Sequence, residues 1–491
     1  MIITMKTLIG LILTIVTSLF VNAQENPFVK WSFETQGKIL SHPVIDEDII
    51  YFGSNDSVFY AVDIKTGKQI WTVRTNSSIQ SKALVNNDIV YFKSGNGVFA
   101  VHKDNGHELW NVSSKNNQRS EQIDPWDYHS GAPAIYDSMI FFGFGNGKLR
   151  GFDLKTGELK RDIIRKDTAA IKSGLIIENS ILYYGDWQGK VYAYNIDMGE
   201  ELWVHSTYEK QLYNTFGQIN TQLCINDNLL FFGGRNPELQ VLDKNTGEKK
   251  WSYIEKDGGW ISGDPLLLND TLFIGGSDNH EMFAFNAKTG QKYWSFLFLN
   301  NNFSKPLAYK NYLLFTTGDA YSVYGTSLGR GYLYALNRAN GRIINFTKVG
   351  GDLYSSLLVK NGVVYMGSAD GKLYSIDLDV FLNENPNLKT KGYNSIEILE
   401  VIPSPFSDSL NISYEINYNT NISIQIKDLN ENEVVKLYSG KVNKGEHHIK
   451  WDGKDNNGNN AQNSYYFLEI NSGEYYKKTI IQKQIPDAKT N

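Results

Sequence analysis

Two short stretches of the sequence carry side chains that are suited to chemistry on a polar ligand. The stretch DPWDYH contributes two carboxylates, two aromatic rings and an imidazole, namely Asp124, Trp126, Asp127, Tyr128 and His129. The stretch GGWISGDP adds Trp260 and Asp264. Carboxylates and imidazoles form hydrogen bonds or exchange protons, and aromatic rings offer flat apolar contact area. Together these residue types indicate a binding site for a polar ligand such as a carbohydrate.

The other candidates are tyrosines and arginines in further glycine-containing stretches, namely Tyr213, Arg235, Tyr321, Tyr324 and Arg330. His129 is the candidate catalytic residue, because an imidazole titrates near neutral pH and could act with a tyrosine or an arginine in polysaccharide cleavage. The alternative for each residue alone is structural. In that interpretation Trp126 and Trp260 are hydrophobic residues that anchor loops. His129 and Asp124 are then hydrogen-bonded loop residues.

Charge and cysteine content exclude several classes of function. Lys and Arg total 48 and Asp and Glu total 53, which gives a net charge of -5, and no run of Lys or Arg forms a basic patch. We therefore expect no nucleic-acid partner. The one cysteine, Cys224, cannot form an intrachain disulfide and is too few for a Cys-rich metal or iron–sulfur site. Its apolar surroundings predict a small buried side chain.

The stretch WDGKDNNGNN invites comparison with a calcium-binding loop. An EF-hand loop that began at Asp455 would need Gly at its sixth position and Glu at its twelfth, where this chain has Asn460 and Tyr466. A solvated hairpin turn is the expected structure. The sequence therefore predicts no metal site.

The first 23 residues have the pattern of a secretory signal peptide. Lys6 precedes an apolar run, residues 8–21, that is too short to span a bilayer, and Ala23 ends a stretch of small residues suited to cleavage. The alternative is an N-terminal anchor helix. We expect an exported protein that begins at Gln24 after cleavage and has no membrane span.

A sequence motif of eleven residues, called here the repeat phrase, recurs along the chain. The candidate residues must be placed relative to these repeats. It reads AVDIKTGKQIW at residues 61–71 and returns as AVHKDNGHELW, AYNIDMGEELW, VLDKNTGEKKW and AFNAKTGQKYW. Two copies lack the tryptophan and end at Arg161 and Asn345, and residues 373–377 begin an eighth copy. A period of about 40–50 residues indicates a repeat architecture.

Each repeat contains four short apolar runs separated by turn residues, with no helical period. In the first repeat they are SHPVID, IIYFGS, VFYAVD and KQIW. Four short strands per unit predict a propeller blade. The N-terminal phrase FVKWSFET lacks a partner, and pairing it with the last repeat would close the ring. The predicted fold class is all-β: an eight-bladed β-propeller of four-stranded antiparallel blades over residues 24–385, closed by the N-terminal strand and followed by a small β-sandwich.

The recurring phrase is predicted to be structural. Asp63 can accept backbone N–H groups in the turn between the third and fourth strands, and Gly67 supplies a positive φ. The tryptophans that end the phrase are expected on the outermost strands, where an indole can pack between blades. These docking tryptophans are Trp31, Trp71, Trp110, Trp203, Trp251 and Trp294.

The lengths of the connections distinguish the two faces of the predicted propeller. The long insertions at residues 111–130, 206–218 and 252–260 precede first strands, and the one at 318–331 follows a second strand. In an antiparallel four-stranded blade, these two classes of connection open on the same end. One face is therefore predicted to be plain. The other, the elaborated face, is predicted to hold the candidate residues.

The repeat phrase resembles the tryptophan-docking motif A-x-D-x-x-T-G-x-x-x-W of PQQ-type propellers, which residues 61–71 match in full. That superfamily includes quinoprotein alcohol dehydrogenases and BamB. The resemblance covers about residues 31–379 and implies a fold rather than a function. A quinoprotein would need PQQ and a Ca²⁺ held by Glu, Asn and Asp, and the dehydrogenase branch has an adjacent-cysteine disulfide. This chain has one cysteine and no convincing ligand set, so we expect neither PQQ nor calcium.

A different pattern follows a linker at residues 386–396. Residues 397–483 predict a small immunoglobulin-like β-sandwich, and residues 484–491 form a tail. The domain resembles the C-terminal sorting domain of type IX secretion cargo from Bacteroidetes and the related FlgD-like fold. The matching residues are Pro403, Pro405, Phe406, Gly445, His447, Trp451, Asp452, Gly453, Gly458, Tyr466 and Phe467. The resemblance implies the type IX secretion machinery as a partner. Ile402, where an aromatic is commoner, and the tail leave open whether the domain is cleaved or retained.

The sequence thus predicts a secreted or cell-surface propeller that binds a glycan or a partner protein on its elaborated face and is not an enzyme. Two enzymatic alternatives remain, a polysaccharide lyase or hydrolase and a PQQ-dependent oxidoreductase. A BamB-like assembly role is disfavoured by the missing lipid-anchor cysteine and by the C-terminal domain that resembles an export signal.

Overall fold

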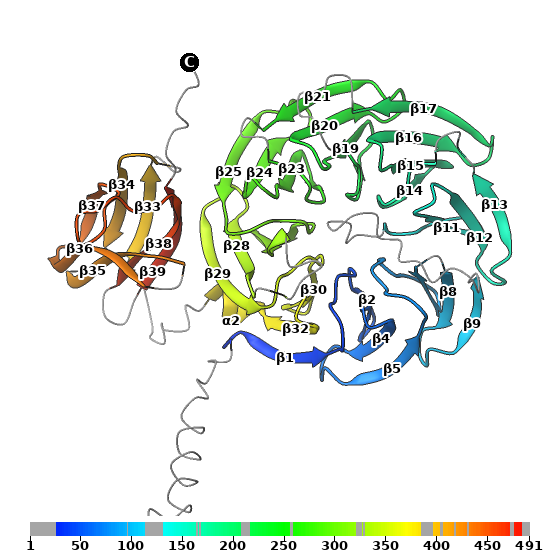
Figure 1. Cartoon of the computed structure of the whole chain (residues 1–491), viewed down its shortest axis with the longest axis horizontal. Coiled ribbons are helices and arrows are strands. Elements are labelled where there is room, and N and C mark those ends of the chain that lie inside the picture. Colours follow the sequence, from blue (N-terminus) through cyan, green and yellow to red (C-terminus); the bar gives the residue numbers. More distant parts are fainter. Residues whose placement is uncertain are drawn as a thin grey trace, which may run out of the picture.

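A ring of eight four-stranded sheets is joined to a two-sheet sandwich (Figure 1). The computed structural model describes residues 26–95, 97–112, 131–163, 165, 168–207, 217–255, 259–320, 327, 329–383, 396–402, 406–416, 419–429, 432–471 and 476–483. No helix in these ranges is long and apolar enough to cross a membrane.

Each sheet of the ring contains four antiparallel strands that follow one another from the centre outward (Figure 1). The innermost strands are β2 (Val44–Asp46), β6 (Leu84–Asn86), β10 (Ala134–Tyr136), β14 (Ile176–Glu178), β18 (Cys224–Ile225), β22 (Leu266–Leu268), β26 (Leu307–Tyr309) and β30 (Leu358–Lys360). The second strands are β3 (Ile49–Gly53), β7 (Ile89–Ser94), β11 (Met139–Gly143), β15 (Ile181–Gly185), β19 (Leu229–Phe232), β23 (Thr271–Gly275), β27 (Tyr312–Thr317) and β31 (Val363–Gly367). The third strands are β4 (Val58–Asp63), β8 (Gly97–His102), β12 (Leu149–Asp153), β16 (Lys190–Asn195), β20 (Glu238–Asp243), β24 (Glu281–Asn286), β28 (Gly331–Asn337) and β32 (Lys372–Asp377). The outermost strands are β5 (Gln69–Arg74), β9 (Glu108–Val112), β13 (Leu159–Ile163), β17 (Glu200–Ser206), β21 (Lys249–Ile254), β25 (Lys292–Leu297), β29 (Ile343–Gly350) and β1 (Val29–Glu34).

Burial explains the composition of these strands. The second and third strands, such as β3 and β4, are buried almost throughout, because each blade packs against a neighbour on both sides. Phe59 of the first blade stacks on Phe92 of the second with ring centroids 4.1 Å apart. The outermost strands are more exposed, and in β5 only Trp71 is buried. Cys224 in β18 is only partly buried, less than its apolar neighbours predicted.

The N-terminal strand closes the ring. β1 pairs antiparallel with β32, with Trp31 opposite Ser375 and Phe33 opposite Leu373. The eighth sheet therefore has the order β1-β32-β31-β30 and takes its outermost strand from the opposite end of the propeller sequence. The predicted eight blades and their closure are confirmed.

Each docking tryptophan reaches from its own blade to the turn of the next blade. The Trp71 indole N–H donates to the Lys103 carbonyl oxygen at 2.8 Å, and a Cβ added at Gly106 would lie 2.6 Å from the Trp71 ring. Gly106 has a φ of 70°, so its backbone and the space beside it both require glycine. The same pair of contacts recurs for the docking tryptophans Trp31, Trp110, Trp203, Trp251 and Trp294.

One of the two copies without tryptophan shows how the contact can be replaced. Asn345 stands at the tryptophan position of β29, and its side-chain amide donates to the Phe381 carbonyl oxygen at 2.7 Å. Phe381 belongs to α2 (Leu378–Asn383), a short helix that follows β32 where the other repeats have a turn. The sequence did not predict this helix, since six residues are too few to show a helical period.

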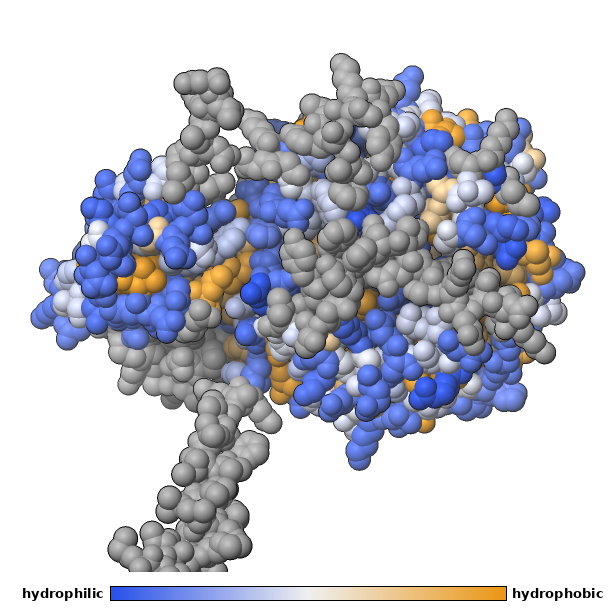
Figure 2. Space-filling model, viewed as in Figure 1, coloured by the Kyte–Doolittle hydropathy of each residue, from blue (hydrophilic) through white to orange (hydrophobic). Residues whose placement is uncertain are grey.

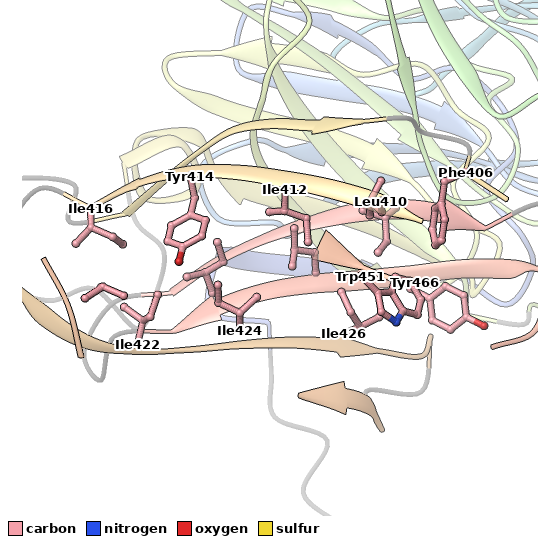
Figure 3. Packing of buried hydrophobic residues seen from close by; sticks show 14 residues of the cluster. Phe406, Leu410, Ile412, Tyr414, Ile416, Ile422, Ile424, Ile426, Trp451 and Tyr466 are labelled. Atoms are coloured by element: carbon pink, nitrogen blue, oxygen red, sulfur yellow. The ribbon is translucent and has the colours of Figure 1, made fainter. Parts of the chain in front are cut away.

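The C-terminal domain is a sandwich of two sheets around one apolar core. One sheet has the order β33 (Ile396–Ile402), β34 (Leu410–Ile416) and β37 (Gly445–Trp451). The other has the order β36 (Glu433–Val442), β35 (Thr420–Lys427), β38 (Ser464–Asn471) and β39 (Tyr476–Lys483). Figure 3 shows Leu410, Ile412, Ile424 and Ile426 meeting between the sheets, with Trp451 among them. The run EVVKLYSGKV, which forms β36, lacks a clear alternation and was not predicted as a strand.

The stretch considered for calcium forms a turn. The Asp455 carboxylate accepts the backbone N–H groups of Asn457 and Asn459, each at 2.9 Å. Trp451 closes the preceding turn, since its indole N–H donates to the Lys454 carbonyl oxygen at 2.8 Å. Within the described ranges, no group of three or more His, Cys, Asp or Glu residues could hold a metal ion.

Strand β38 contacts both domains. One of its faces packs in the core of the sandwich, and the other packs against the propeller. Tyr466, Leu468 and Ile470 lie in the core of the sandwich, whereas the alternate residues Tyr465 and Phe467 pack against the propeller. The Phe467 and Phe346 ring centroids are 6.0 Å apart. The Tyr465 hydroxyl lies 2.7 Å from His280 Nδ1. Burial lowers the pKa of His280 to about 4, so this imidazole is neutral at physiological pH.

We expect Phe467→Ser to release the C-terminal domain from the propeller without unfolding it. The Phe467 ring is only 2% exposed and its contacts are with the propeller cluster, so a polar residue there weakens the interface while the sandwich core stays intact. Small-angle X-ray scattering should show a larger radius of gyration than for the parent chain. The control is Leu429→Ser, since Leu429 is exposed on the same domain. Equal radii for all three proteins would contradict a docking role for Phe467.

Candidate functional site

The two classes of long connection lie on one end of the propeller. Residues that precede an innermost strand form hydrogen bonds with the turn between the second and third strands of the preceding blade. Ile79 N–H donates to the Ser54 carbonyl oxygen at 3.1 Å, and Ile219 N–H donates to the Asp186 carbonyl oxygen at 3.0 Å. The same bond joins Ile261 to the turn after β19. This end is the elaborated face.

The structure describes four of the predicted site residues. These are Arg235, Trp260, Asp264 and Arg330, all on the elaborated face. The other candidates, Asp124, Trp126, Asp127, Tyr128, His129, Tyr213, Tyr321 and Tyr324, lie outside the described residues.

An arginine lies between two indoles at the turns of three successive blades. The Arg235 guanidinium carbon is 4.8 Å from the centre of the Trp260 ring and 5.0 Å from that of Trp187. Arg235 is 1% exposed, and both tryptophans are partly exposed. Cation–π contacts of this kind contribute about 0.5–2 kcal/mol each. We call these three residues the Trp-Arg-Trp cluster.

The turn that carries Trp187 is held by a buried ion pair. Asp186 accepts a hydrogen bond from Arg165 Nη1 at 2.7 Å and from the Tyr192 hydroxyl at 2.8 Å. Its other oxygen accepts the Gln188 N–H at 2.9 Å. These bonds fix the backbone around Trp187. The sequence analysis missed Trp187, although a tryptophan in the short turn DWQG of the fourth repeat was a visible signal.

One residue of each blade lies near the centre of the elaborated face, two positions before the innermost strand. The eight residues of this axial ring are His42, Lys82, Ala132, Gly174, Gln222, Asp264, Lys305 and Ser356. Hydrogen bonds link neighbours in the ring: Gln222 N–H donates to Asp264 Oδ1 at 2.7 Å, and Ser356 N–H donates to His42 Nδ1 at 2.9 Å. The innermost strands that follow these residues surround the centre in Figure 1.

The residue before each axial position anchors the segment in most blades. In the first blade the Ser41 hydroxyl donates to the Gly53 carbonyl oxygen at 2.8 Å and accepts the Gly53 N–H at 2.9 Å. Ser81, Ser173, Thr221, Ser304 and Ser355 form related bonds to the residue twelve positions later, at the end of the second strand. The axial side chains are therefore held at one common height by the repeat.

Burial sets the charge of the axial ring. Asp264 is 4% exposed, and this desolvation raises the pKa of its carboxyl to about 6, although the Gln222 N–H, Lys305 and Lys82 favour the ionised form. Burial and the charge of Lys305 lower the pKa of Lys82. Lys82 and Asp264 stand in the second and sixth blades, so their interaction crosses the axis.

Arg330 lies apart from both groups. Its guanidinium Nη1 is 2.7 Å from Asp319 Oδ2, and its backbone N–H donates to Asp352 Oδ1 at 3.1 Å. Ser327 donates to the other oxygen of Asp352 at 2.7 Å. These contacts stabilise the ends of the connection between β27 and β28. The Arg330 guanidinium is paired with Asp319, so its role here is structural.

A family model matches most of the propeller. The model described as "Outer membrane protein assembly factor BamB" matches residues 22–205 and 187–323. The chain belongs to this BamB family. A second model, the FlgD Ig-like domain, matches residues 408–474 of the sandwich. The resemblance of the repeat phrase to BamB-like propellers and that of the C-terminal motifs to the FlgD-like fold are confirmed.

Two sequence relatives are BamB proteins. The chain is 28% identical over 149 residues to BamB from Legionella pneumophila (strain Paris), which is 28% of this chain and 36% of that protein. It is 28% identical over 162 residues to BamB from Kangiella koreensis, which is 33% of this chain and 39% of that protein. The chain thus spans less than two fifths of the length of these relatives.

Solved structures share the fold at low identity. The crystal structure of BamB from Moraxella catarrhalis superposes with a TM-score of 0.54 at 17% identity, covering 71% of this chain and 96% of that one. A quinohemoprotein alcohol dehydrogenase from Comamonas testosteroni gives a TM-score of 0.56 at 14% identity, covering 77% and 79%. Because binding proteins and enzymes share this fold, it does not identify a function.

Proposed function

We propose that this protein is an exported binding protein that holds a glycan on its elaborated face and has no catalytic role. The Trp-Arg-Trp cluster is the observation that supports this function. Two partly exposed indoles, fixed by the buried Arg235 guanidinium between them, offer flat apolar area. Such rings suit a sugar, whose apolar ring faces can pack on aromatic side chains.

A protein ligand is the second candidate. The family is named for an assembly factor, and the relatives from Legionella and Kangiella carry the same name, which favours a polypeptide partner. On the one face drawn in Figure 2, the described residues are mostly hydrophilic, with apolar residues in several patches, including one on the C-terminal domain. Protein interfaces have a more apolar core, so this surface favours the glycan.

We propose that this protein holds neither PQQ nor calcium. A quinoprotein site needs several carboxylate or amide oxygens around Ca²⁺, and no such group of acidic residues occurs among the described residues. The polysaccharide-cleaving alternative depends on His129, which lies outside them. The axial ring offers Asp264 and His42, but both are engaged with neighbouring ring residues.

We also propose an export route for this protein. The apolar N-terminal segment would direct it across the inner membrane, and the C-terminal domain would then be its signal for type IX secretion. The packing of Tyr465 and Phe467 on the propeller supports a domain that stays in place after export.

We expect the double variant Trp187→Ala/Trp260→Ala to lower glycan affinity by tenfold or more, because each lost aromatic contact contributes about 1 kcal/mol or more. The parent chain would first be screened on an array of neutral and acidic oligosaccharides, and the strongest binder measured by titration calorimetry. Tyr293→Ala is the matched control, since Tyr293 is an exposed aromatic on outer strand β25.

Three outcomes would contradict the glycan-binding function. The array could show no binding, which would favour the protein ligand. The double variant could bind as the parent chain does, which would exclude the Trp-Arg-Trp cluster as the site. Finally, PQQ with Ca²⁺ could raise the melting temperature by several degrees, as tight binding to the folded state would require. That result would favour the hypothesis of a PQQ-dependent oxidoreductase.

A further inference from the structure

Two lysines of the axial ring, Lys82 and Lys305, lie close enough for their charges to interact. Lys82 precedes β6 and Lys305 precedes β26, each two positions before an innermost strand. The residues between them in the ring are His42 and Ser356, which are joined to each other through His42 Nδ1. Ser356 also accepts the Lys305 backbone N–H at 3.3 Å. The backbone around both lysines is therefore fixed.

Neither ammonium group has a hydrogen bond or an ion pair with any described residue. The acid that interacts with the charges of both lysines is Asp264, whose oxygen Oδ1 accepts the Gln222 N–H. Two positive charges that share a partly buried space repel one another, and one buried carboxyl cannot balance both. The repulsion between the two ammonium groups is therefore costly in isolation.

Two of the axial residues are small. Ala132 and Gly174 occupy two of the eight axial positions, so the third and fourth blades contribute little side-chain volume there. A Cβ at Gly174 would lie 1.6 Å from Gln222 Oε1, which shows that the Gln222 side chain extends over this position. The amide of Gln222 thus lies on the side of the ring near the Trp-Arg-Trp cluster, whose Arg235 backbone is bonded to Gln218.

We propose that Lys82 and Lys305 bind one oxyanion group of the ligand, a carboxylate or a sulfate carried by a sugar, at the axis of the propeller. This inference rests on the proposed glycan-binding function and assigns that function to acidic glycans. An oxyanion between the two ammonium groups would remove their repulsion and accept hydrogen bonds from both. The indoles of the Trp-Arg-Trp cluster would contact neighbouring sugar rings.

The test compares the acidic and neutral forms of one oligosaccharide with a sulfated oligosaccharide. Affinities for oligogalacturonate, for its methyl ester and for a sulfated galactan oligomer would be measured by titration calorimetry with the full chain. The double variant Lys82→Met/Lys305→Met is expected to bind the better acidic form at least tenfold more weakly, because charged hydrogen bonds contribute strongly to binding. Its affinity for the methyl ester should be unchanged. A preference for the carboxylated or the sulfated form identifies the oxyanion.

The matched control is Lys65→Met/Lys288→Met, which removes two exposed lysines from turns between third and fourth strands, on the plain face. This variant has the same net charge as the axial variant and should bind all three oligosaccharides normally. If both double variants lose affinity equally, a general charge effect operates and the axial site is overturned. Melting temperatures would be recorded for all three proteins, and Lys82→Gln/Lys305→Gln would replace the axial variant if methionine lowers folding yield.

A separate readout distinguishes this inference from the proposed function. Inorganic sulfate should raise the melting temperature of the parent chain more than that of the axial variant. If sulfate does so while no oligosaccharide binds, the anion site stands and the glycan-binding function fails. If oligosaccharides bind and the axial variant matches the parent chain in both assays, the glycan-binding function stands and the anion site fails.

Discussion

Trp71→Ala is expected to lower the free energy of unfolding by about 3–5 kcal/mol, the usual cost of truncating a buried indole. The Trp71 side chain is 7% exposed and donates its N–H to the Lys103 carbonyl oxygen of the next blade. Its ring also contacts Tyr51 and Phe59, with centroids 5.7 Å and 6.2 Å away. Alanine would leave a cavity between two blades and an unpaired carbonyl group. Urea denaturation followed by tryptophan fluorescence and circular dichroism would measure the change.

Two further variants show whether the docking contact is responsible. Tyr293→Ala removes an aromatic ring that is 49% exposed on an outermost strand and should change the free energy of unfolding by less than about 0.5 kcal/mol. Gly106→Ala keeps the indole but places a Cβ 2.6 Å from it on a residue with a φ of 70°. This change should cost about 1 kcal/mol or more. A Trp71→Ala cost no greater than that of Tyr293→Ala would show that indole docking does not hold the blades together.

The fold could be predicted from the sequence because the repeat phrase contains two local signals, a turn and a tryptophan. Asp63 accepts the Thr66 N–H and hydroxyl at 2.7 Å and 2.8 Å, so the turn can be predicted from its own residues. The tryptophan at the end of the phrase marks the outermost strand. What the phrase did not reveal is that its glycine receives the indole of the preceding blade, because that contact joins residues of different repeats.

The elements that escaped prediction have weak local patterns. β36 has no strict alternation because it borders a small sandwich and is largely exposed. α2 is a single short helix whose position is set by the Asn345 side chain on a neighbouring blade. In both cases the conformation depends on tertiary contacts, which the local sequence pattern does not reveal.

Only part of the candidate site could be predicted from the sequence, again because some of its residues come together only in the folded protein. Trp260 and Asp264 were selected because they lie in a long, glycine-rich connection, where binding residues concentrate. Lys82 and Lys305 lie in the unremarkable dipeptide Ser-Lys and were not selected. Their significance appears only when the eight repeats are superposed about the axis, since residues more than 200 positions apart then share one ring.

The charge of Asp264 makes the stability of the protein depend on pH. The pKa of this carboxyl is about 6 in the folded protein and about 3.9 in an unfolded chain. The folded state therefore binds the proton more tightly, and the favourable contribution of the protonated acid is complete below about pH 4. It is lost as the pH rises through 6, where the folded protein must bury a charged carboxylate. By linkage, a shift of this size corresponds to about 3 kcal/mol at neutral pH.

Asp264→Asn is accordingly expected to stabilise the protein by about 1–3 kcal/mol at pH 7.5 and to have little effect at pH 4. The amide oxygen can still accept the Gln222 N–H, whereas the lost attraction to Lys82 and Lys305 makes the gain smaller than the full linkage value. The free energy of unfolding would be measured for both proteins from pH 4 to pH 8. Asp270→Asn is the control, since Asp270 is exposed and its difference from the parent chain should vary little over this range. A variant that is less stable than the parent chain at pH 7.5 would show that the two lysines stabilise the buried carboxylate by more than its desolvation costs.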